Sequence, residues 1–182
     1  MSRRLSYVTL AVAGIAVSSL TLSGCASASS SHSATTAAAG CAGVELVINY
    51  HLLEGGDVDQ CVPVTGTTTV AEVLKQAQVS TEGTVQYGDQ VVCRVNGLPA
   101  AGEPFTVEGH DPYTETCQTM APEYAYWALW VKGAQLATWD YAQSGVSTEQ
   151  VGPGDAVGLV FSTGGAAPQP TPVSALSVPV EK

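Results

Sequence analysis

Within residues 41–163, one segment repeats its apolar residues at helical spacing, and the other apolar segments have the composition of strands. The repeat at i, i+3, i+4 and i+7 comprises Val70, Val73, Leu74 and Ala77. Thr69 followed by Glu72 fits the capping box that begins a helix. The sequence therefore predicts one main helix over residues 70–78.

Strand-forming segments lie on both sides of this helix. Residues 44–52 are rich in β-forming side chains, the sequence EGGD follows as a turn, and residues 60–64 would return beside them. After the helix, residues 90–97 end in Asn-Gly, the strongest short turn signal. Further strands are predicted at 124–132, at 135–141 and, after the turn sequence GPGD, at 156–162.

Two strands, a helix and three or more further strands make up an α+β pattern. A hairpin followed by a helix that crosses a mixed sheet is the β-grasp plan, and we expect a fold of this kind. A three-layer fold and a β-sandwich remain alternatives on the same pattern.

The N-terminus has the pattern of an export signal. Arg3 and Arg4 precede a mostly apolar run over residues 5–22, and Leu-Ser-Gly-Cys follows, ending at Cys25. This tetrapeptide resembles the lipobox of bacterial lipoproteins, in which the chain is cleaved before the cysteine and the cysteine is lipidated. The resemblance implies a signal peptide at 1–24, a lipid on Cys25 and a location on the extracytoplasmic face of the cell membrane. An uncleaved anchor is the alternative and would leave the topology unchanged.

Four cysteines follow Cys25, namely Cys41, Cys61, Cys93 and Cys117. An even number in an oxidising compartment predicts two disulfides, for which three pairings are possible. We favour Cys41–Cys61 and Cys93–Cys117, because each pair consists of neighbours in the sequence and would close a local loop. Each disulfide is expected to contribute about 3 kcal/mol by the loop-entropy relation.

Charge and composition limit the partners and the extent of the domain. All 16 Asp and Glu follow Cys25 but only four Lys and Arg do, so the net charge after Cys25 is −12. An acidic surface repels phosphate backbones, which argues against a nucleic-acid partner. Residues 25–40 fit a flexible tether, and residues 164–182, rich in Pro and small side chains, fit a disordered tail. We expect one domain over residues 41–163 and a monomeric protein.

Four motifs occur in the order that characterises a known domain family: TVAEVLKQAQV, VVCRVNGLPA, YAYWALWVKG and GPGDAVGLVF. Together they resemble the C-terminal domain of transcobalamin and intrinsic factor, which also occurs alone in bacterial surface lipoproteins as a domain of unknown function. The positions of Cys61, Cys93 and Cys117 are similar to those of an actinobacterial branch. The resemblance covers residues 44–162 and implies a β-grasp fold.

The resemblance also implies a binding module, with a corrinoid as a possible ligand. In the vitamin B12 carriers this domain covers one face of cobalamin. The larger helical domain that holds the other face has no counterpart in this sequence, so no cobalamin contact is assigned to a particular residue.

The segment YAYWALWVKG concentrates aromatic side chains in one predicted strand. Alternation places Tyr126, Ala128, Trp130 and Lys132 on one face and Trp127, Leu129 and Val131 on the other. Because an unpaired lysine is costly to bury, the face of Lys132 should be the outer one and Trp127 should belong to the core.

The outer face of this strand supplies the predicted ligand-binding residues. Tyr126 and Trp130, joined by Trp139 or Tyr141 from the next strand, would form an apolar aromatic patch, and such patches often mark binding surfaces. The alternatives are that the helix or the long loop over 98–122 covers these rings, or that a bulge exchanges the two faces.

No catalytic or metal-binding constellation stands out in the sequence. His110 beside Asp111 fits a solvated loop, and Asp57 with Asp59 supplies too few oxygens for calcium. We therefore expect a protein that is not an enzyme and has no cofactor. Two functions fit: a membrane-anchored module that captures a small ligand such as a corrinoid for uptake, or a cell-surface module that binds another protein or a glycan.

Overall fold

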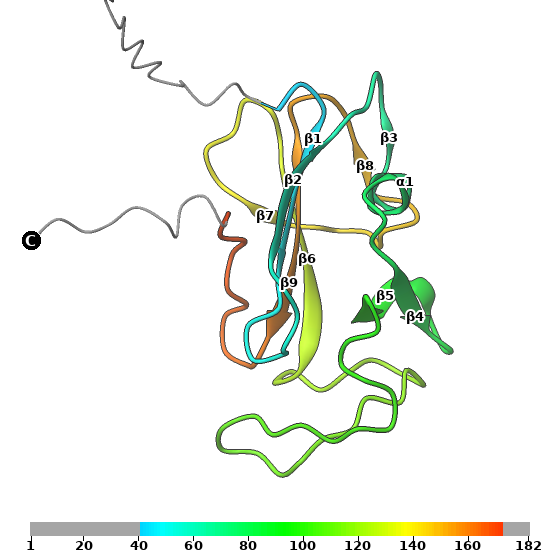
Figure 1. The fold of residues 1–182 in the computed structure, drawn as a ribbon, viewed down its shortest axis with the longest axis vertical. Coiled ribbons are helices and arrows are strands. Elements are labelled where there is room, and N and C mark those ends of the chain that lie inside the picture. The colour runs from blue at the N-terminus through cyan, green and yellow to red at the C-terminus, as the bar shows by residue number, and fades with distance from the viewer. Residues whose placement is uncertain (1–40, 173–182) are drawn as a thin grey trace, which may run out of the picture. The chain divides into compact units, whose positions relative to one another are not determined.

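A five-stranded mixed sheet with the order β2-β1-β9-β6-β7 runs through the centre of the fold (Figure 1). β1 (Val44–Asn49) pairs antiparallel with β2 (Val58–Val62) and parallel with β9 (Ala156–Ser162). β9 pairs antiparallel with β6 (Tyr126–Lys132), and β6 pairs with the two-residue β7 (Asp140–Tyr141). The last strand of the described residues, β9, therefore lies at the centre of the sheet.

The computed structural model describes residues 41–172, which belong to the unit Ala38–Lys182. The predicted signal peptide 1–24, Cys25, the rest of the tether to residue 40 and the last ten residues of the tail lie outside the described residues. Within 41–172, no helix has the length and apolar character needed to cross a membrane.

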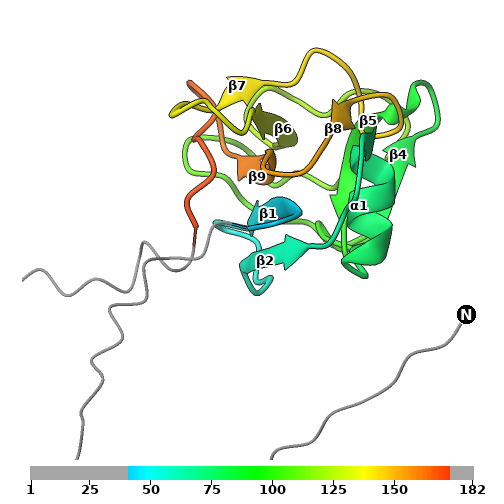
Figure 2. The same cartoon turned by 90° about the horizontal axis from the view of Figure 1, so that it is seen from above.

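The helix α1 (Val70–Gln76) covers one face of the sheet, and the segment after β9 lies on the other face (Figure 2). Thr69 begins the helix as predicted, because its Oγ1 accepts a hydrogen bond from the Glu72 N–H at 3.3 Å. The helix ends two residues earlier than expected, since Gln78 adopts a positive φ of 60°. A mixed sheet with one short helix confirms the predicted α+β class.

Several strand boundaries differ from the predictions. β1 stops at Asn49 because the chain turns there, with His51 at a φ of 51° and the Leu53 N–H bonded to the Tyr50 carbonyl. Of the strand expected over 135–141 only β7 forms, because a turn at Gly133 delays the pairing. Two small sheets were not expected as such: β3 (Thr68–Thr69) with β8 (Gln150–Val151), and β4 (Thr81–Thr84) with β5 (Gly88–Val95).

The main core lies between the sheet and the layer of α1. Trp127 belongs to it, as the alternation predicted, with rings edge-on to Tyr50 at 5.2 Å and to Phe161 at 5.4 Å. A second, smaller cluster on the opposite, outer face contains Ala128, Trp130 and Val160. The two faces of β6 therefore follow the predicted assignment, with no bulge between them.

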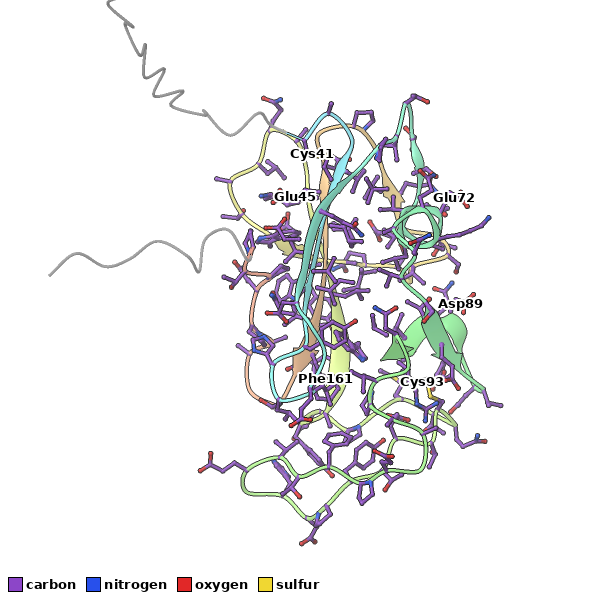
Figure 3. All side chains as sticks on the ribbon, in the orientation of Figure 1. Cys41, Glu45, Glu72, Asp89, Cys93 and Phe161 are labelled. Carbon is purple, nitrogen blue, oxygen red and sulfur yellow. A yellow bond between two sulfur atoms is a disulfide. The ribbon has the colours of Figure 1, made fainter. Side chains whose placement is uncertain are left out.

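The two disulfides are those favoured from the sequence, Cys41–Cys61 and Cys93–Cys117. Figure 3 shows Cys41 near one end of the sheet and Cys93 on the side of the β4–β5 hairpin. Two disulfides indicate an oxidising, extracytoplasmic compartment.

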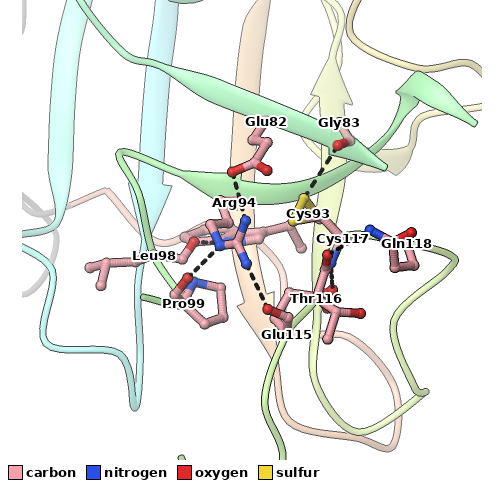
Figure 4. Close-up of polar contacts among 11 residues, drawn as sticks. Glu82, Gly83, Cys93, Arg94, Leu98, Pro99, Glu115, Thr116, Cys117 and Gln118 are labelled. Atoms are coloured by element: carbon pink, nitrogen blue, oxygen red, sulfur yellow. Dashed lines mark hydrogen bonds and ion pairs between the residues drawn. A yellow bond between two sulfur atoms is a disulfide. The ribbon is translucent and has the colours of Figure 1, made fainter. Parts of the chain in front are cut away.

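Arg94 of β5 organises the long loop between β5 and β6 (Figure 4). Its Nε donates to the Pro99 carbonyl at 2.8 Å and its Nη2 donates to the Glu115 carbonyl at 2.6 Å. Its Nη1 pairs with the Glu82 carboxylate at 2.7 Å. One buried guanidinium thus joins the start of the loop, at Pro99, and its middle part, at Glu115, to the β4–β5 hairpin.

Candidate ligand-binding site

The four aromatic residues predicted as ligand contacts come together around the outer face of β6 and its edge. Trp130 stands opposite Tyr141 in the β6–β7 register, and their ring centroids are 5.2 Å apart. Tyr126 and Trp139 pack against the small outer cluster that contains Trp130. The Lys132 Nζ lies 4.9 Å from the centre of the Trp139 ring, within range of a cation–π contact.

These rings differ in their accessibility. Trp130 is only 9% exposed, in line with the alternative that these rings are covered, whereas Tyr141 is 45% exposed. The cover comes from neither the helix nor the long loop: residues after β9 turn back across the outer face, and Ala167 packs on the cluster. Residues 164–172, expected to belong to a disordered tail, are therefore placed in part against the sheet.

A cleft of about 490 Å³ opens at the edge of β6, on the side away from β9. Its buried wall includes Trp127 and Leu159, and its opposite wall includes Gln90–Val92 of β5. Met120 and Tyr141 are exposed residues at its border. Two of the four predicted aromatic residues, Tyr126 and Tyr141, thus line the cleft, while Trp130 and Trp139 do not.

The cleft exists because β7 pairs with only a short part of β6. The hydrogen-bonded pairing of β6 with β7 ends at the bond from the Ala142 N–H to the Leu129 carbonyl, at 3.0 Å. The chain then turns toward β5, where the Gly145 N–H donates to the Gln90 Oε1 at 3.4 Å. A Cβ on Gly145 would lie 2.4 Å from the Gln90 Cα, so only glycine permits this approach. The first residues of β6 consequently have no β7 partner, and the cleft lies beside them.

The charge of the cleft limits the ligands it can hold. Glu123 contributes a carboxylate to the lining, and no lining residue is Lys or Arg. The three cations of residues 41–172 are engaged elsewhere: Lys75 with Glu72, Arg94 with the long loop, and Lys132 with Glu45. The cleft therefore suits a neutral or cationic ligand better than an anionic one.

Tyr141 offers a neutral hydroxyl at the border of the cleft. Burial, followed by the neighbouring Tyr126, raises the pKa of Tyr141 above its ordinary value of 10.0. The hydroxyl is therefore protonated at neutral pH and can both donate and accept a hydrogen bond. An amphipathic ring of this kind suits a ligand that is largely apolar with a few polar groups.

Other residues considered from the sequence have structural partners. His110 stacks on Tyr124 with ring centroids 3.8 Å apart. The Asp57 carboxylate accepts hydrogen bonds from the Tyr50 N–H and the Asn49 side chain, as expected of a turn residue. Glu82 lies near Cys93 and Cys117, but those two sulfurs form a disulfide and are not free to bind a metal.

Sequence reasoning missed the walls of the cleft outside β6. Met120 and Glu123 lie in one segment, Gln90 comes about 30 residues earlier in the chain, and nothing in their local sequence indicates a common site. Comparison with protein-family models, with curated proteins and with solved structures found no match to this chain.

Proposed function

We propose that this chain is an extracytoplasmic binding module, anchored to a membrane through Cys25, that captures a small neutral or cationic ligand in the cleft beside β6. The observation that carries the proposal is the cleft itself. Its volume of about 490 Å³ lies in the range of small-molecule sites, roughly 300–1,000 Å³. Its lining is largely apolar with a few polar groups, which is the usual composition of such sites.

The fold and the anchor are parts of the same proposal. The strand order β2-β1-β9-β6-β7, with β1 parallel to β9 and a helix after the first hairpin, supports a β-grasp assignment. The Leu-Ser-Gly-Cys sequence supports lipidation of Cys25, and the two disulfides are consistent with export. A module held this way would collect ligand at the membrane surface and deliver it for uptake.

A corrinoid is the first ligand to test. A whole corrinoid exceeds the volume of the cleft, so only one edge of it would enter. Its peripheral amide groups could pair with Tyr141 and with Gln90, both of which line the cleft. This interpretation predicts a moderate affinity, because most of the ligand would stay in contact with solvent.

The experiment is a calorimetric titration of the chain from Ala26 to Lys182 with cobalamin and with cobinamide. A saturable heat that weakens by about tenfold in the Tyr141→Ala variant, the equivalent of 1.4 kcal/mol, is the expected result. Tyr87→Ala is the matched control, because Tyr87 has a similar exposure of 42% against 45% but does not line the cleft.

Two outcomes would count against parts of this proposal. A flat titration with a folded protein would remove the corrinoid as ligand. A screen of small neutral and cationic fragments, monitored by NMR, would then test the cleft. Chemical-shift changes centred on Trp127 and Tyr141 would support the cleft as a binding site, and the absence of localised changes would rule it out.

A second function, binding of another surface protein or a glycan, is favoured by one observation. Val85 and Met120 are 74% and 62% exposed, and hydrogen bonds from Val85 and Gln86 to the carbonyls of Cys117 and Gln118 bring their two segments together. Exposed apolar side chains in such a group can mark a contact surface. Loss of a cross-linked surface partner in a Val85→Ser, Met120→Ser variant with unchanged stability would support this second function.

A further inference from the structure

The outer face of the sheet holds a short segment of the chain's own C-terminal region, Ala167–Thr171, which we call the strap. The Asn49 side chain exchanges two hydrogen bonds with the backbone of Thr171: Oδ1 accepts from the Thr171 N–H at 2.8 Å, and Nδ2 donates to the Thr171 carbonyl at 3.0 Å. Asn49 is only 3% exposed, and Asp57 Oδ2 accepts from the same Nδ2 at 3.2 Å. The amide is thus held in an orientation that recognises extended backbone.

A notch in β9 receives the strap next to this amide. A Cβ built on Gly158 would lie 2.1 Å from the Cγ of Pro170, so the proline ring occupies the space that any other residue would fill. Pro170 is buried, and Ala167 packs against Ala128, Trp130 and Val160. The outer face therefore combines an amide clamp, a proline notch and an aromatic wall.

The strap does not satisfy every polar group beneath it. The Trp130 Nε1 and the Ser162 Oγ are buried without a hydrogen-bond partner. Both residues belong to the outer face, because they alternate with the core residues Trp127 and Phe161 along β6 and β9. Buried polar groups without partners are destabilising, so a segment that placed a carbonyl near Trp130 would bind this face better than the strap does.

We propose that the outer face is a binding site for an uncharged, proline-containing extended segment of a partner polypeptide, and that the strap fills this site when the partner is absent. The strap sequence indicates the class of ligand: Pro168 and Pro170 alternate with Gln169 and Thr171, which favours the polyproline II conformation. Proline-rich segments of this kind dock on aromatic grooves whose Trp and Tyr side chains donate to their carbonyls. The site is distinct from the cleft, since Asn49 and Gly158 do not line the cleft.

The first test concerns the strap in the intact chain from Ala26 to Lys182. Gly158→Ala should release the strap, and the hydrogen exchange of the Thr171 amide and the Trp130 indole N–H, followed by NMR, should accelerate by at least about tenfold. Pro170→Gly should do the same without altering the sheet. Gly56→Ala is the matched control, because a Cβ there would meet nothing within 4 Å. Exchange in Gly158→Ala and Pro170→Gly equal to that in the control would overturn the proposal.

The second test concerns recognition in trans. A synthetic peptide of residues 165–172, GAAPQPTP, is titrated into the Pro170→Gly chain. We expect the peptide to protect the Trp130 indole N–H from hydrogen exchange in a saturable way. The dissociation constant of the peptide should be on the order of millimolar, comparable with the effective concentration of a short tether. The same peptide with Pro170→Gly, and the wild-type peptide added to the Gly158→Ala chain, should give no protection.

The outcomes of this titration separate two roles of the strap. Protection by the wild-type peptide alone supports a recognition site that partners can occupy. Two results would overturn the proposed site and leave the strap as a structural cover only. One is no protection at a peptide concentration tenfold above the expected dissociation constant, and the other is equal protection by both peptides.

Discussion

The guanidinium of Arg94 and the backbone carbonyl of Glu115 lie 2.6 Å apart, and both residues are buried. Together with the bond from Arg94 Nε to the Pro99 carbonyl, this contact holds a loop that has few apolar side chains of its own. The loop supplies Met120 and Glu123 to the cleft, so its anchorage bears on ligand binding as well as on stability.

Replacing Arg94 should destabilise the protein substantially. Arg94→Lys removes the planar fork that reaches Pro99, Glu115 and Glu82 together, and we expect the free energy of unfolding to fall by about 2–4 kcal/mol. Lys75→Met is the control, because Lys75 is an exposed cation whose side chain is 78% accessible, and its loss should cost about 0.5 kcal/mol or less. Urea denaturation of both variants measures the difference, and equal losses would contradict the anchoring role of Arg94.

The two disulfides should have similar effects on stability but different effects on ligand binding. Each closes a loop of 20 or 24 residues, so replacing either pair by serine should cost about 3 kcal/mol. Only Cys93–Cys117 joins a wall of the cleft, next to Val92, to the segment that leads to Met120. The variant without this pair should lose affinity for cleft ligands, whereas the variant without Cys41–Cys61 should retain it at a temperature where both are folded.

Alkaline conditions should destabilise the protein through two tyrosines, the buried Tyr50 and the partly buried Tyr113. Burial, then the Glu115 carboxylate, raises the pKa of Tyr113, whose hydroxyl donates to Glu115 Oε2 at 2.9 Å. Burial also raises the pKa of Tyr50, against the opposing effect of its bond from Asn96. Because these pKa values in the folded state exceed the ordinary value of 10.0, the associated stability is intact below pH 10 and is lost as the pH rises further. Denaturant midpoints measured from pH 8 to pH 11 would show the decline, and Tyr113→Phe should make it less steep.

Two buried tryptophans on opposite faces of β6 form a matched pair. The Trp127 Nε1 donates to the Leu98 carbonyl at 3.0 Å, whereas the Trp130 Nε1 has no partner. Both changes to phenylalanine remove a similar volume, but only Trp127→Phe removes a hydrogen bond, after which the Leu98 carbonyl keeps the Val95 N–H as its donor. We expect Trp127→Phe to cost about 1 kcal/mol more than Trp130→Phe. Equal costs would mean that the Trp130 indole is hydrogen-bonded in solution.

Features set by local chemistry could be predicted from the sequence. The Thr69–Glu72 cap and the Asn96-Gly97 turn depend on residues a few positions apart, and both occur in the structure. The faces of β6 follow from alternation along one strand. The preferred disulfide pairing was confirmed because neighbouring cysteines closed loops that the sheet could accommodate.

The cleft and the strap could not be predicted, because each depends on contacts between distant segments. The cleft requires Gly145 to approach Gln90 and β7 to stop after two residues. The strap has a composition typical of disorder. Its binding site on the sheet is formed by Asn49, which is 122 residues away from Thr171, and by Gly158, which leaves room for Pro170 because it has no Cβ. Trp130 is buried because the strap binds at this site, and not because of any property of β6.

The central position of β9 has a consequence for how the protein is made. β9 is the last strand of the sheet, yet it separates β1 from β6 and pairs with both. β1 and β6 therefore cannot join into one sheet until residues 156–162 have been synthesised, and their contacts span most of the chain. The central sheet of a nascent chain with this topology therefore cannot form before β9 has been made, and until then β1 and β6 lack the strand that joins them.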